Sequence, residues 1–346
     1  MTYRKVLAGT ALAAALAIGF GGAAMAADSV TLRFNQWFPS AHWSQKDGLF
    51  PWFEEIAKVT EGRVVVQSSN SPLAPPTRNY QAVVDGIADM AWGPHGYTPG
   101  LFPLTELVEL PFKTEDAGVS SVAYWRLWEA MLKPTGMQGD VVTLGMHVTA
   151  GGNIHMREAP VLSVEDLKAK RLRVPTPVVG RVLAKLGAVP VSGSLNELRE
   201  MLSRGAVDGT AITDELVVGF KVDKEVHAIT QIPGGIYSNS AFIIVNAKIW
   251  GEIAPKDQQA ILAISGEAIS RKMGALWQQN DTEARSMFQQ RLGDKYVAAP
   301  EALMAGLRTA FAEDEAAIFA KAKELGVDPE AALAFYNQQI QALGGK

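Results

Sequence analysis

VTLRF at residues 30–34, RVVVQ at 63–67 and ADMAW at 88–92 are three short, largely apolar runs that predict β-strands. Two segments with helical patterns lie between them, at about 43–60 and about 77–86. The order strand–helix–strand–helix–strand is typical of a parallel sheet covered by helices. This stretch therefore assigns the chain to the α/β class.

The rest of the chain predicts a second unit and a helical tail. The sequence AGGN at 150–153 predicts a crossover into a second domain, and a later strand predicts a return to the first. Several crossovers without a long linker imply two lobes that can hinge around a ligand. The expected elements are strands at 141–148, 170–174 and 240–245, and helices at 178–186, 195–203, 257–292, 301–325 and 328–343.

Composition limits the classes of function. The chain has 346 residues, of which 48% are hydrophobic and 20% charged, which fits a globular protein of two domains. Its net charge of -4 argues against a nucleic-acid partner, which calls for a basic stripe. It has no cysteine, so disulfides, thiol nucleophiles and cysteine-based metal sites are excluded.

Residues 1–26 have the pattern of a secretory signal peptide. Arg4 and Lys5 precede an uncharged run at 6–20, and Ala-Met-Ala at 24–26 supplies a cleavage site. The alternative, a membrane anchor, needs about 20 apolar residues, more than this run provides. Cleavage would leave 30 basic and 36 acidic side chains, a net charge of -6. The pattern predicts export to the bacterial periplasm.

The sequence offers no assembled catalytic motif. The five histidines lack the close spacing of a metal-binding helix, and no nucleophile elbow or phosphate-binding loop is present. His42 and His95 follow strand ends, where ligands commonly bind, although solvated loop histidines are the simpler interpretation. Asp214 and Glu215 could act as a base or hold a cation, but the alternative is an exposed pair at a helix start.

Arg173 is the most informative side chain. It lies within the predicted strand 170–174, which Pro175 ends. An arginine buried at such a position must be paired, because an isolated charge away from water costs several kcal/mol. Its planar fork matches a carboxylate. The partner is either a ligand carboxylate or an internal Asp or Glu, and the strand pattern alone leaves both open.

The chain resembles the DctP-type extracytoplasmic solute receptors of tripartite ATP-independent periplasmic (TRAP) transporters. Six motifs carry the resemblance, in the same order as in the family. Each motif alone is weak, but together they cover about 200 residues. They are FPWFEEIAKVTEGRV at 50–64, VDGIADM at 84–90, the stretch 102–112 ending in ELPF, VEDLKAKRLRVP at 164–175, GAVDG at 205–209 and the segment 246–259.

The resemblance implies an α/β periplasmic binding protein fold of two lobes, with mixed sheets, hinge strands and a long helix spanning both. Residues 27–150 and about 239–280 would form lobe I. Residues 151–238 and about 281–346 would form lobe II and the C-terminal helices. It further implies a receptor that delivers its ligand to the small and large membrane subunits of a TRAP permease. Because no catalytic constellation is visible, the protein is not expected to be an enzyme, and no cofactor or metal is expected in the leading interpretation.

In that family the arginine of the R-V-P motif, here Arg173, binds the substrate carboxylate. Asn153 stands where sialic-acid receptors carry a second arginine, which argues against sialic acid. The other expected ligand-binding residues are mostly apolar: Trp37, Gly93, His95, Leu195, Ile212, Thr213, Gly235, Ile236 and Tyr237.

The expected ligand is therefore an organic acid with one firmly held carboxylate and a partly apolar or aromatic body. A C4 dicarboxylate remains an alternative, its second carboxylate held by Asn153, His42 or backbone amides. Three further functions stay open: a sensory ligand-binding protein, a periplasmic enzyme, and a receptor that also binds a cation at Asp214 and Glu215.

Overall fold

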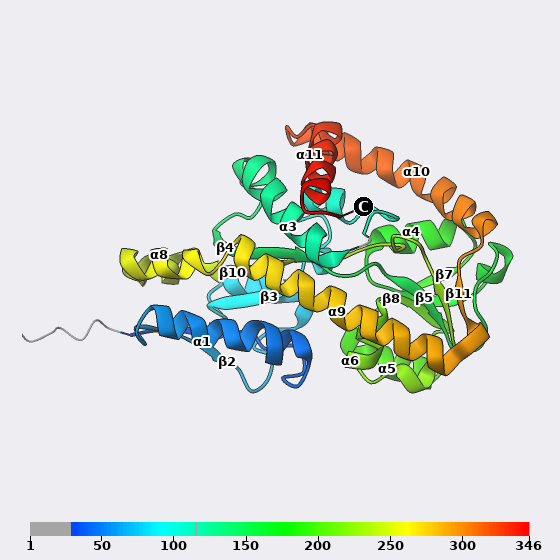
Figure 1. The fold of residues 1–346 in the computed structure, drawn as a ribbon, viewed down its shortest axis with the longest axis horizontal. Helices are drawn as coiled ribbons and strands as arrows, with labels where there is room; N and C mark the ends of the chain where they lie inside the picture. The colour runs from blue at the N-terminus through cyan, green and yellow to red at the C-terminus, as the bar shows by residue number, and fades with distance from the viewer. Residues whose placement is uncertain (1–28, 115, 346) are drawn as a thin grey trace, which may run out of the picture.

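The computed structural model describes residues 29–114 and 116–345, so the predicted signal peptide lies outside the described residues. Two lobes lie side by side along the long axis, each built on its own β-sheet (Figure 1). The predicted α/β class and two-lobe fold are confirmed. No helix of the described ranges is long and apolar enough to span a membrane.

The sheet of lobe I has the strand order β2-β1-β3-β10-β4. Its strands are β1 (Val30–Phe34), β2 (Val64–Ser68), β3 (Met90–Pro94), β4 (Val141–Val148) and β10 (Ser240–Asn246). β1 is parallel to β2 and β3, as predicted, while β10 is antiparallel to β3 and β4, which makes the sheet mixed.

The sheet of lobe II has the order β11-β9-β5-β8-β6-β7 and is also mixed. Its strands are β5 (Asn153–Met156), β6 (Arg171–Val174), β7 (Val189–Ser192), β8 (Gly209–Ile212), β9 (Ala228–Gln231) and β11 (Tyr296–Ala298). β6 runs parallel to β7 and β8, and β5 runs antiparallel to β8 and β9.

Helices cover both faces of each sheet. The α-helices are α1 (Phe50–Val59), α2 (Asn79–Val84), α3 (Ala117–Leu127), α4 (Pro177–Lys185), α5 (Leu195–Ser203), α6 (Asp214–Gly219), α7 (Ala247–Glu252), α8 (Pro255–Ala263), α9 (Glu267–Leu292), α10 (Glu301–Glu324) and α11 (Pro329–Ala342). In β10, Ile243 and Val245 pack with α1 and α9, whereas Phe242 and Ile244 face α2, as strand alternation requires.

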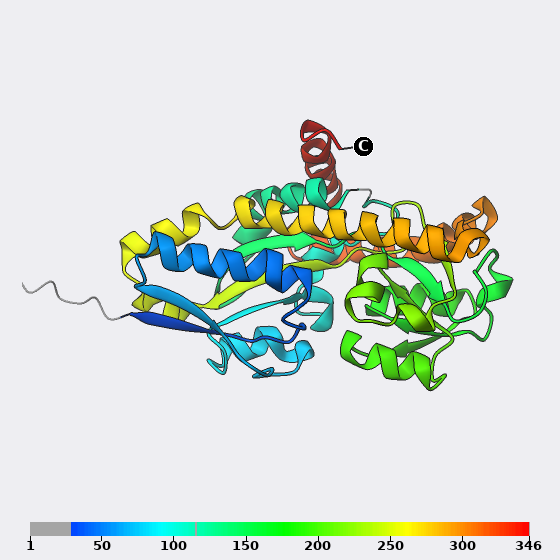
Figure 2. The same cartoon turned by 60° about the horizontal axis from the view of Figure 1, so that its bottom comes forward.

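The prediction of a single helix over 257–292 is wrong, because this segment forms two helices, α8 and α9. Gly266 adopts a φ of 62° and its N–H donates to the carbonyl of Leu144 at 2.6 Å. A residue with a side chain would be strained there. Beyond this break α9 runs across both lobes, as expected of the long helix (Figures 1 and 2).

Two segments without helix or strand, 149–152 and 232–239, connect the lobes. They bond to each other where they cross: the N–H of Gly152 donates to the carbonyl of Tyr237 at 2.8 Å, and that of Ile236 to Gly152 at 2.9 Å. Gly151 and Gly235 touch, since a Cβ added to Gly235 would lie 2.5 Å from the Gly151 Cα. The backbones can approach this closely only without side chains. We call this crossing the hinge.

Candidate ligand-binding site

Arg173 is buried in β6, with 1% of its surface exposed. Its Nε–H donates to the carbonyl of Gly193 at 2.9 Å. Among the described residues no carboxylate forms an ion pair with it. The carboxylate of Glu197 lies near enough for Arg173 to contribute to its lowered pKa, after the hydrogen bonds that it accepts from Ser194. The internal ion pair that would have explained this arginine is therefore absent from the described residues.

The side of lobe I that faces the cleft is aromatic. Trp37 stacks on Trp92 with 5.6 Å between ring centroids, and its indole N–H donates to the Trp92 carbonyl at 2.8 Å. Tyr97 is tilted against Trp37 at 5.8 Å. Trp37 is thereby fixed in orientation, and its neighbour Tyr97 lines the groove described next.

A groove of about 550 Å³ separates the lobes at the mouth of the cleft. Where the groove closes, a Cβ added to Gly96 of lobe I would lie 2.9 Å from the Thr176 methyl group of lobe II. The lobes are therefore in contact. The lining residues include Pro75, Pro76, Thr77, Gly96, Tyr97 and Pro99 of lobe I and Val174, Pro175, Thr176, Pro177, Gly193 and Glu197 of lobe II.

The loop after β1 also reaches lobe II. The indole N–H of Trp43 donates to Glu215 Oε2 at 2.8 Å, and His42 Nε2 lies 3.5 Å from the same oxygen. Phe38 and Phe220 pack edge to face at 4.9 Å. The expectation that His42 is a solvated loop residue is wrong, because only 4% of it is exposed.

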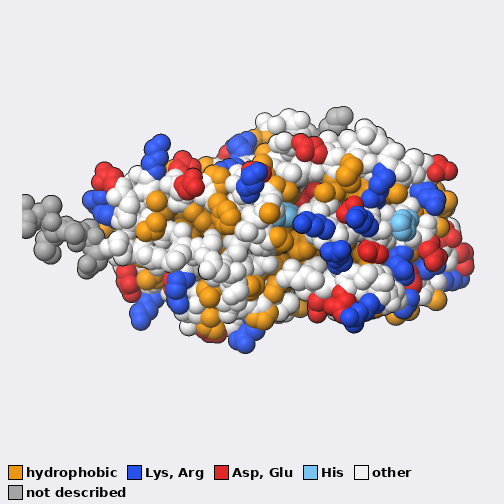
Figure 3. All heavy atoms as spheres, turned by 90° about the horizontal axis from the view of Figure 1, so that it is seen from below, with side chains coloured by type: hydrophobic (Ala, Val, Ile, Leu, Met, Phe, Trp, Pro, Cys, Tyr) orange, Lys and Arg blue, Asp and Glu red, His pale blue; other side chains and the backbone are white. Residues whose placement is uncertain are grey.

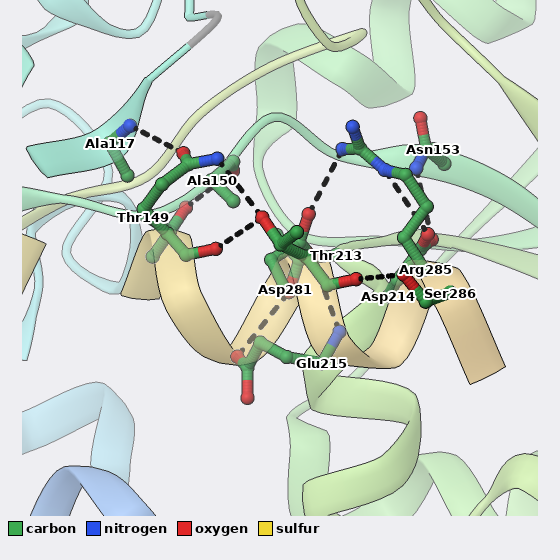
Figure 4. Close-up of polar contacts among 12 residues, drawn as sticks. Ala117, Thr149, Ala150, Asn153, Thr213, Asp214, Glu215, Asp281, Arg285 and Ser286 are labelled. Atoms are coloured by element: carbon green, nitrogen blue, oxygen red, sulfur yellow. Dashed lines mark hydrogen bonds and ion pairs between the residues drawn. The ribbon is translucent and has the colours of Figure 1, made fainter. Parts of the chain in front are cut away.

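Asn153 forms two hydrogen bonds within the protein. Its amide Nδ2 donates to Asp214 Oδ1 at 2.9 Å, and its Oδ1 accepts the N–H of Ile232 at 2.9 Å. It therefore ties β5 to both α6 and the start of the hinge. Figure 4 shows Asp214 between Asn153 and Arg285.

Asp214 and Glu215 are buried, so the alternative of an exposed pair at a helix start is wrong. Asp214 accepts from His155 at 2.9 Å and from the Tyr296 hydroxyl at 2.7 Å, in addition to Asn153. Its oxygens are thus occupied by protein donors. Within 29–114 and 116–345 no group of three or more His, Asp and Glu side chains is arranged to hold a metal ion.

His95 lies in the core of lobe I rather than in solvent. Its Nδ1 is 3.0 Å from the Ser240 hydroxyl and its Nε2 is 3.0 Å from the Gln138 amide. Burial lowers its pKa to about 3, so it is neutral at physiological pH. Both ring nitrogens are engaged within the protein, which leaves neither for a ligand.

The remaining predicted residues fall into three places. Gly93 is enclosed between Asn79 and Phe242 in the sheet, and Leu195 and Ile212 belong to a hydrophobic core. Thr213 is fully buried beside Glu215, its hydroxyl 3.4 Å from Glu215 Oε1. The last three, Gly235, Ile236 and Tyr237, lie in the hinge.

Burial raises the pKa of the Tyr237 hydroxyl, and the groups near enough to act on it are Arg173, which lowers it, and Tyr97, Glu215 and Asp281, which raise it. Arg173 thus lies within electrostatic range of the Tyr237 hydroxyl, which forms no hydrogen bond within the described residues. Tyr97 and Asp281 were not predicted, although the strand-end position of Tyr97, two residues after His95, could have signalled it.

The family model for bacterial extracellular solute-binding proteins, family 7 (DctP), matches residues 36–322. The outer membrane transporter protein TsaT of Comamonas testosteroni is 30% identical over 345 residues, 99% of each chain.

Solved structures agree. A TRAP periplasmic solute-binding protein of Bordetella bronchiseptica with bound (R)- and (S)-mandelate is 31% identical, with a TM-score of 0.86 over 91% of this chain and 99% of that one. A TRAP solute-binding protein of Rhodoferax ferrireducens in complex with benzoate is 26% identical, with a TM-score of 0.82 over 91% and 98%. The chain belongs to the DctP family of bacterial extracellular solute-binding proteins, the receptors of TRAP transporters.

Proposed function

We propose that this receptor captures an aromatic monocarboxylate in the periplasm and delivers it to the small and large subunits of a TRAP permease. The observation that carries the proposal is Arg173, a buried guanidinium that has no carboxylate partner among the residues the structure describes. Burying a charge without a partner is costly, so a ligand anion would supply the missing half of the pair.

The surroundings support one carboxylate rather than two. Asn153, which stands where a second cation would be needed, is committed to Asp214 and Ile232. Trp37 and Tyr97 supply aromatic surface, which suits an aryl group through stacking and burial. Two structures of 26–31% identity contain the aromatic acids mandelate and benzoate, which supports the same class for this chain.

A binding screen tests the class of ligand. The chain from Ala27 onward would be unfolded and refolded to remove carried-over ligand, then melted with benzoate, mandelate, 3-hydroxybenzoate, C4 dicarboxylates, amino acids and sugars. A ligand at 100 times its Kd stabilises the fold by about 2.7 kcal/mol. We expect shifts from the aromatic acids alone. A shift from the dicarboxylates alone would transfer the assignment to a dicarboxylate receptor.

Substitution of Arg173 tests its role as the anchor. Arg173→Lys keeps a positive charge but loses the fork, so we expect benzoate affinity to fall about tenfold or more, which is about 1.4 kcal/mol or more. Arg171→Lys is the matched control, since Arg171 lies in the same strand but is exposed and paired with Asp208 at 2.6 Å. Unchanged binding by a folded Arg173→Lys variant, measured by calorimetry, would contradict the assignment.

A further inference from the structure

A second cavity between the lobes lies beside the groove, and Glu109 lines it. This cavity, of about 260 Å³, shares with the groove the contact between Gly96 of lobe I and Thr176 of lobe II. A smaller cavity has Glu109, Thr176 and Val178 in common with it and reaches the hinge residues 236–238. Both cavities have walls from the two lobes, so they are closed off only while the lobes are in contact.

The carboxyl group of Glu109 has protein donors for only one of its oxygens. Its Oε1 accepts the N–H of Ser240 at 2.9 Å and the Ser240 hydroxyl at 2.6 Å. Its Oε2 accepts no hydrogen bond from the described residues. Arg181 also lines the cavity, but it is paired with Asp314 at 2.5 Å. A negative charge on Glu109 is therefore poorly compensated in the closed receptor, whereas a protonated carboxyl needs no cation.

The groups around Glu109 add no free positive charge. Burial raises the pKa of its carboxyl to about 7, against the lowering effect of the Ser240 hydrogen bonds, and the charge of Glu106 adds to the rise. His95, bonded to Ser240, is neutral. The titratable and charged side chains that line the two cavities, or lie next to the residues that do, are Glu106, His95, Tyr124, Tyr237, Arg181 and Asp314.

Glu109 is also connected to the hinge through its neighbours in the chain. The Ser238 hydroxyl donates to the carbonyl of Val108 at 3.1 Å, and the N–H of Phe112 donates to the carbonyl of Gly235 at 2.7 Å. The segment that carries Glu109 thus runs along the returning hinge segment. A change in the angle between the lobes acts directly on the surroundings of this carboxyl group.

We propose that Glu109 takes up a proton when the lobes close on a ligand, so that the receptor captures its organic acid together with a proton. The proton comes from water and is held on Oε2, because Oε1 is occupied by the two donors of Ser240. Opening separates Gly96 from Thr176 and admits water to the cavity, which favours the ionised carboxylate and releases the proton. This inference goes beyond the proposed function, since it depends on closure rather than on the class of acid.

Calorimetry measures the proton directly. Benzoate, or whichever acid gives the largest shift in the melting screen, is titrated into the refolded chain at pH 6 in cacodylate and in Bis-Tris, two buffers that release protons with different heats. We expect the two binding enthalpies to differ by the uptake of about one proton, because pH 6 lies between the ordinary pKa of a glutamate and the raised one. The Kd should rise about tenfold from pH 6 to pH 8. Equal enthalpies in the two buffers would overturn the proposal.

Substitutions identify the group that takes up the proton. Glu109→Gln keeps an oxygen for the donors of Ser240 but cannot titrate, so we expect no uptake and a Kd that changes less than twofold over the same pH range. Glu106→Gln is the matched control, since Glu106 lines the same two cavities, and it should keep the uptake. Ser240→Ala removes a donor that favours the charged form, so the loss of affinity should move to higher pH.

Two results with these variants would overturn the proposal: uptake that persists in Glu109→Gln, and a pH dependence in Ser240→Ala identical to that of the wild type. Failure of the wild type to bind any carboxylate would instead overturn the proposed function, so the two failures are distinguishable.

Discussion

Asp214 and Asp281 are both fully buried beside the cleft, yet their surroundings shift their pKa values in opposite directions. Burial raises the pKa of Asp214, but the hydrogen bonds and charge of His155 and the donors Asn153 and Tyr296 lower it overall. Asp281 has fewer donors. Burial first, and then the charge of Asp214, raise its pKa to about 8, against the lowering effect of Arg285.

This difference predicts a pH-dependent stability. In the unfolded chain Asp281 ionises near pH 3.9, whereas in the folded chain it keeps its proton up to about pH 8. Because the folded state binds the extra proton, stability falls as pH rises between these values, by up to about 1.4 kcal/mol per unit. Asn cannot ionise, so Asp281→Asn should remove this dependence.

The measurement is the melting temperature of Asp281→Asn against the wild type at pH 5 and pH 8. We expect the variant to gain about 5 °C or more relative to the wild type between the two. Glu283→Gln, an exposed position on the same helix, is the control and should show no such change. Parallel pH curves for Asp281→Asn and the wild type would contradict the prediction.

Single residues differ in how far the sequence reveals them. Arg173 stands out in the sequence between the apolar Leu172 and Val174 of a strand, but its assignment to a ligand rests on the family resemblance, because the strand pattern left an internal ion pair equally open. Asp281 could not, because it lies in the polar run QQNDTEAR, which predicts an exposed helix surface. Its burial comes from α6, whose residue Glu215 donates its N–H to Asp281 Oδ1 at 3.3 Å across 66 residues of sequence.

At the scale of elements, the predicted strands of lobe I were found because their patterns are local. α3 was missed, since it is buried on several sides and includes Ser120 and Ser121, so it has no clear apolar stripe. β8 and β9 are four residues long and almost wholly buried, which leaves no alternation to detect. In these elements tertiary packing, rather than periodicity, determines the structure.

The packing of α9 on α3 gives a prediction for an element. Gly274 lies inside α9 at the point where α3 packs against it. A side chain there would prevent this close approach, since an added Cβ would lie 2.4 Å from Ser121 Oγ and 2.6 Å from the Ala117 carbonyl oxygen. Gly274→Ala should therefore destabilise the fold by about 1–3 kcal/mol in chemical denaturation, despite the better helix propensity of alanine.

Gly251, in α7, is the matched control, because no atom lies within 4 Å of its added Cβ. Gly251→Ala should leave stability unchanged or raise it by up to about 1 kcal/mol. If both substitutions stabilise the protein equally, the close approach of α3 and α9 is not what requires glycine at 274.

For the molecule as a whole, the question is what favours closure when the cleft is empty. Seen from below, Lys and Arg side chains lie interspersed with Asp and Glu side chains over the half that holds lobe II (Figure 3). Such a mixed surface does not by itself favour one arrangement of the lobes. The Trp43–Glu215 hydrogen bond, in contrast, is a direct link between them.

We therefore expect Trp43→Phe to favour the open form. In the wild type the Trp43 ring packs edge to face on Trp277, with 4.8 Å between ring centroids. The variant keeps an aromatic ring in this place but loses the N–H that donates to the buried Glu215 carboxylate. A hydrogen bond to a charged group is worth about 1.5–3 kcal/mol, so the ratio of closed to open receptor should fall about tenfold or more. Benzoate affinity should fall in proportion to the closed fraction lost.

Because the chain has no cysteine, a spin-label pair can be introduced at Thr77 and Asn196, which are exposed on opposite lobes near the groove. The distance distribution of Trp43→Phe, with and without benzoate, should shift toward longer distances than that of the wild type. Trp250→Phe, on α7 and remote from the cleft, should leave the distribution unchanged. Identical distributions for Trp43→Phe and the wild type would mean that the hinge and the ligand alone set the closed state, and that the Trp43–Glu215 contact only accompanies it.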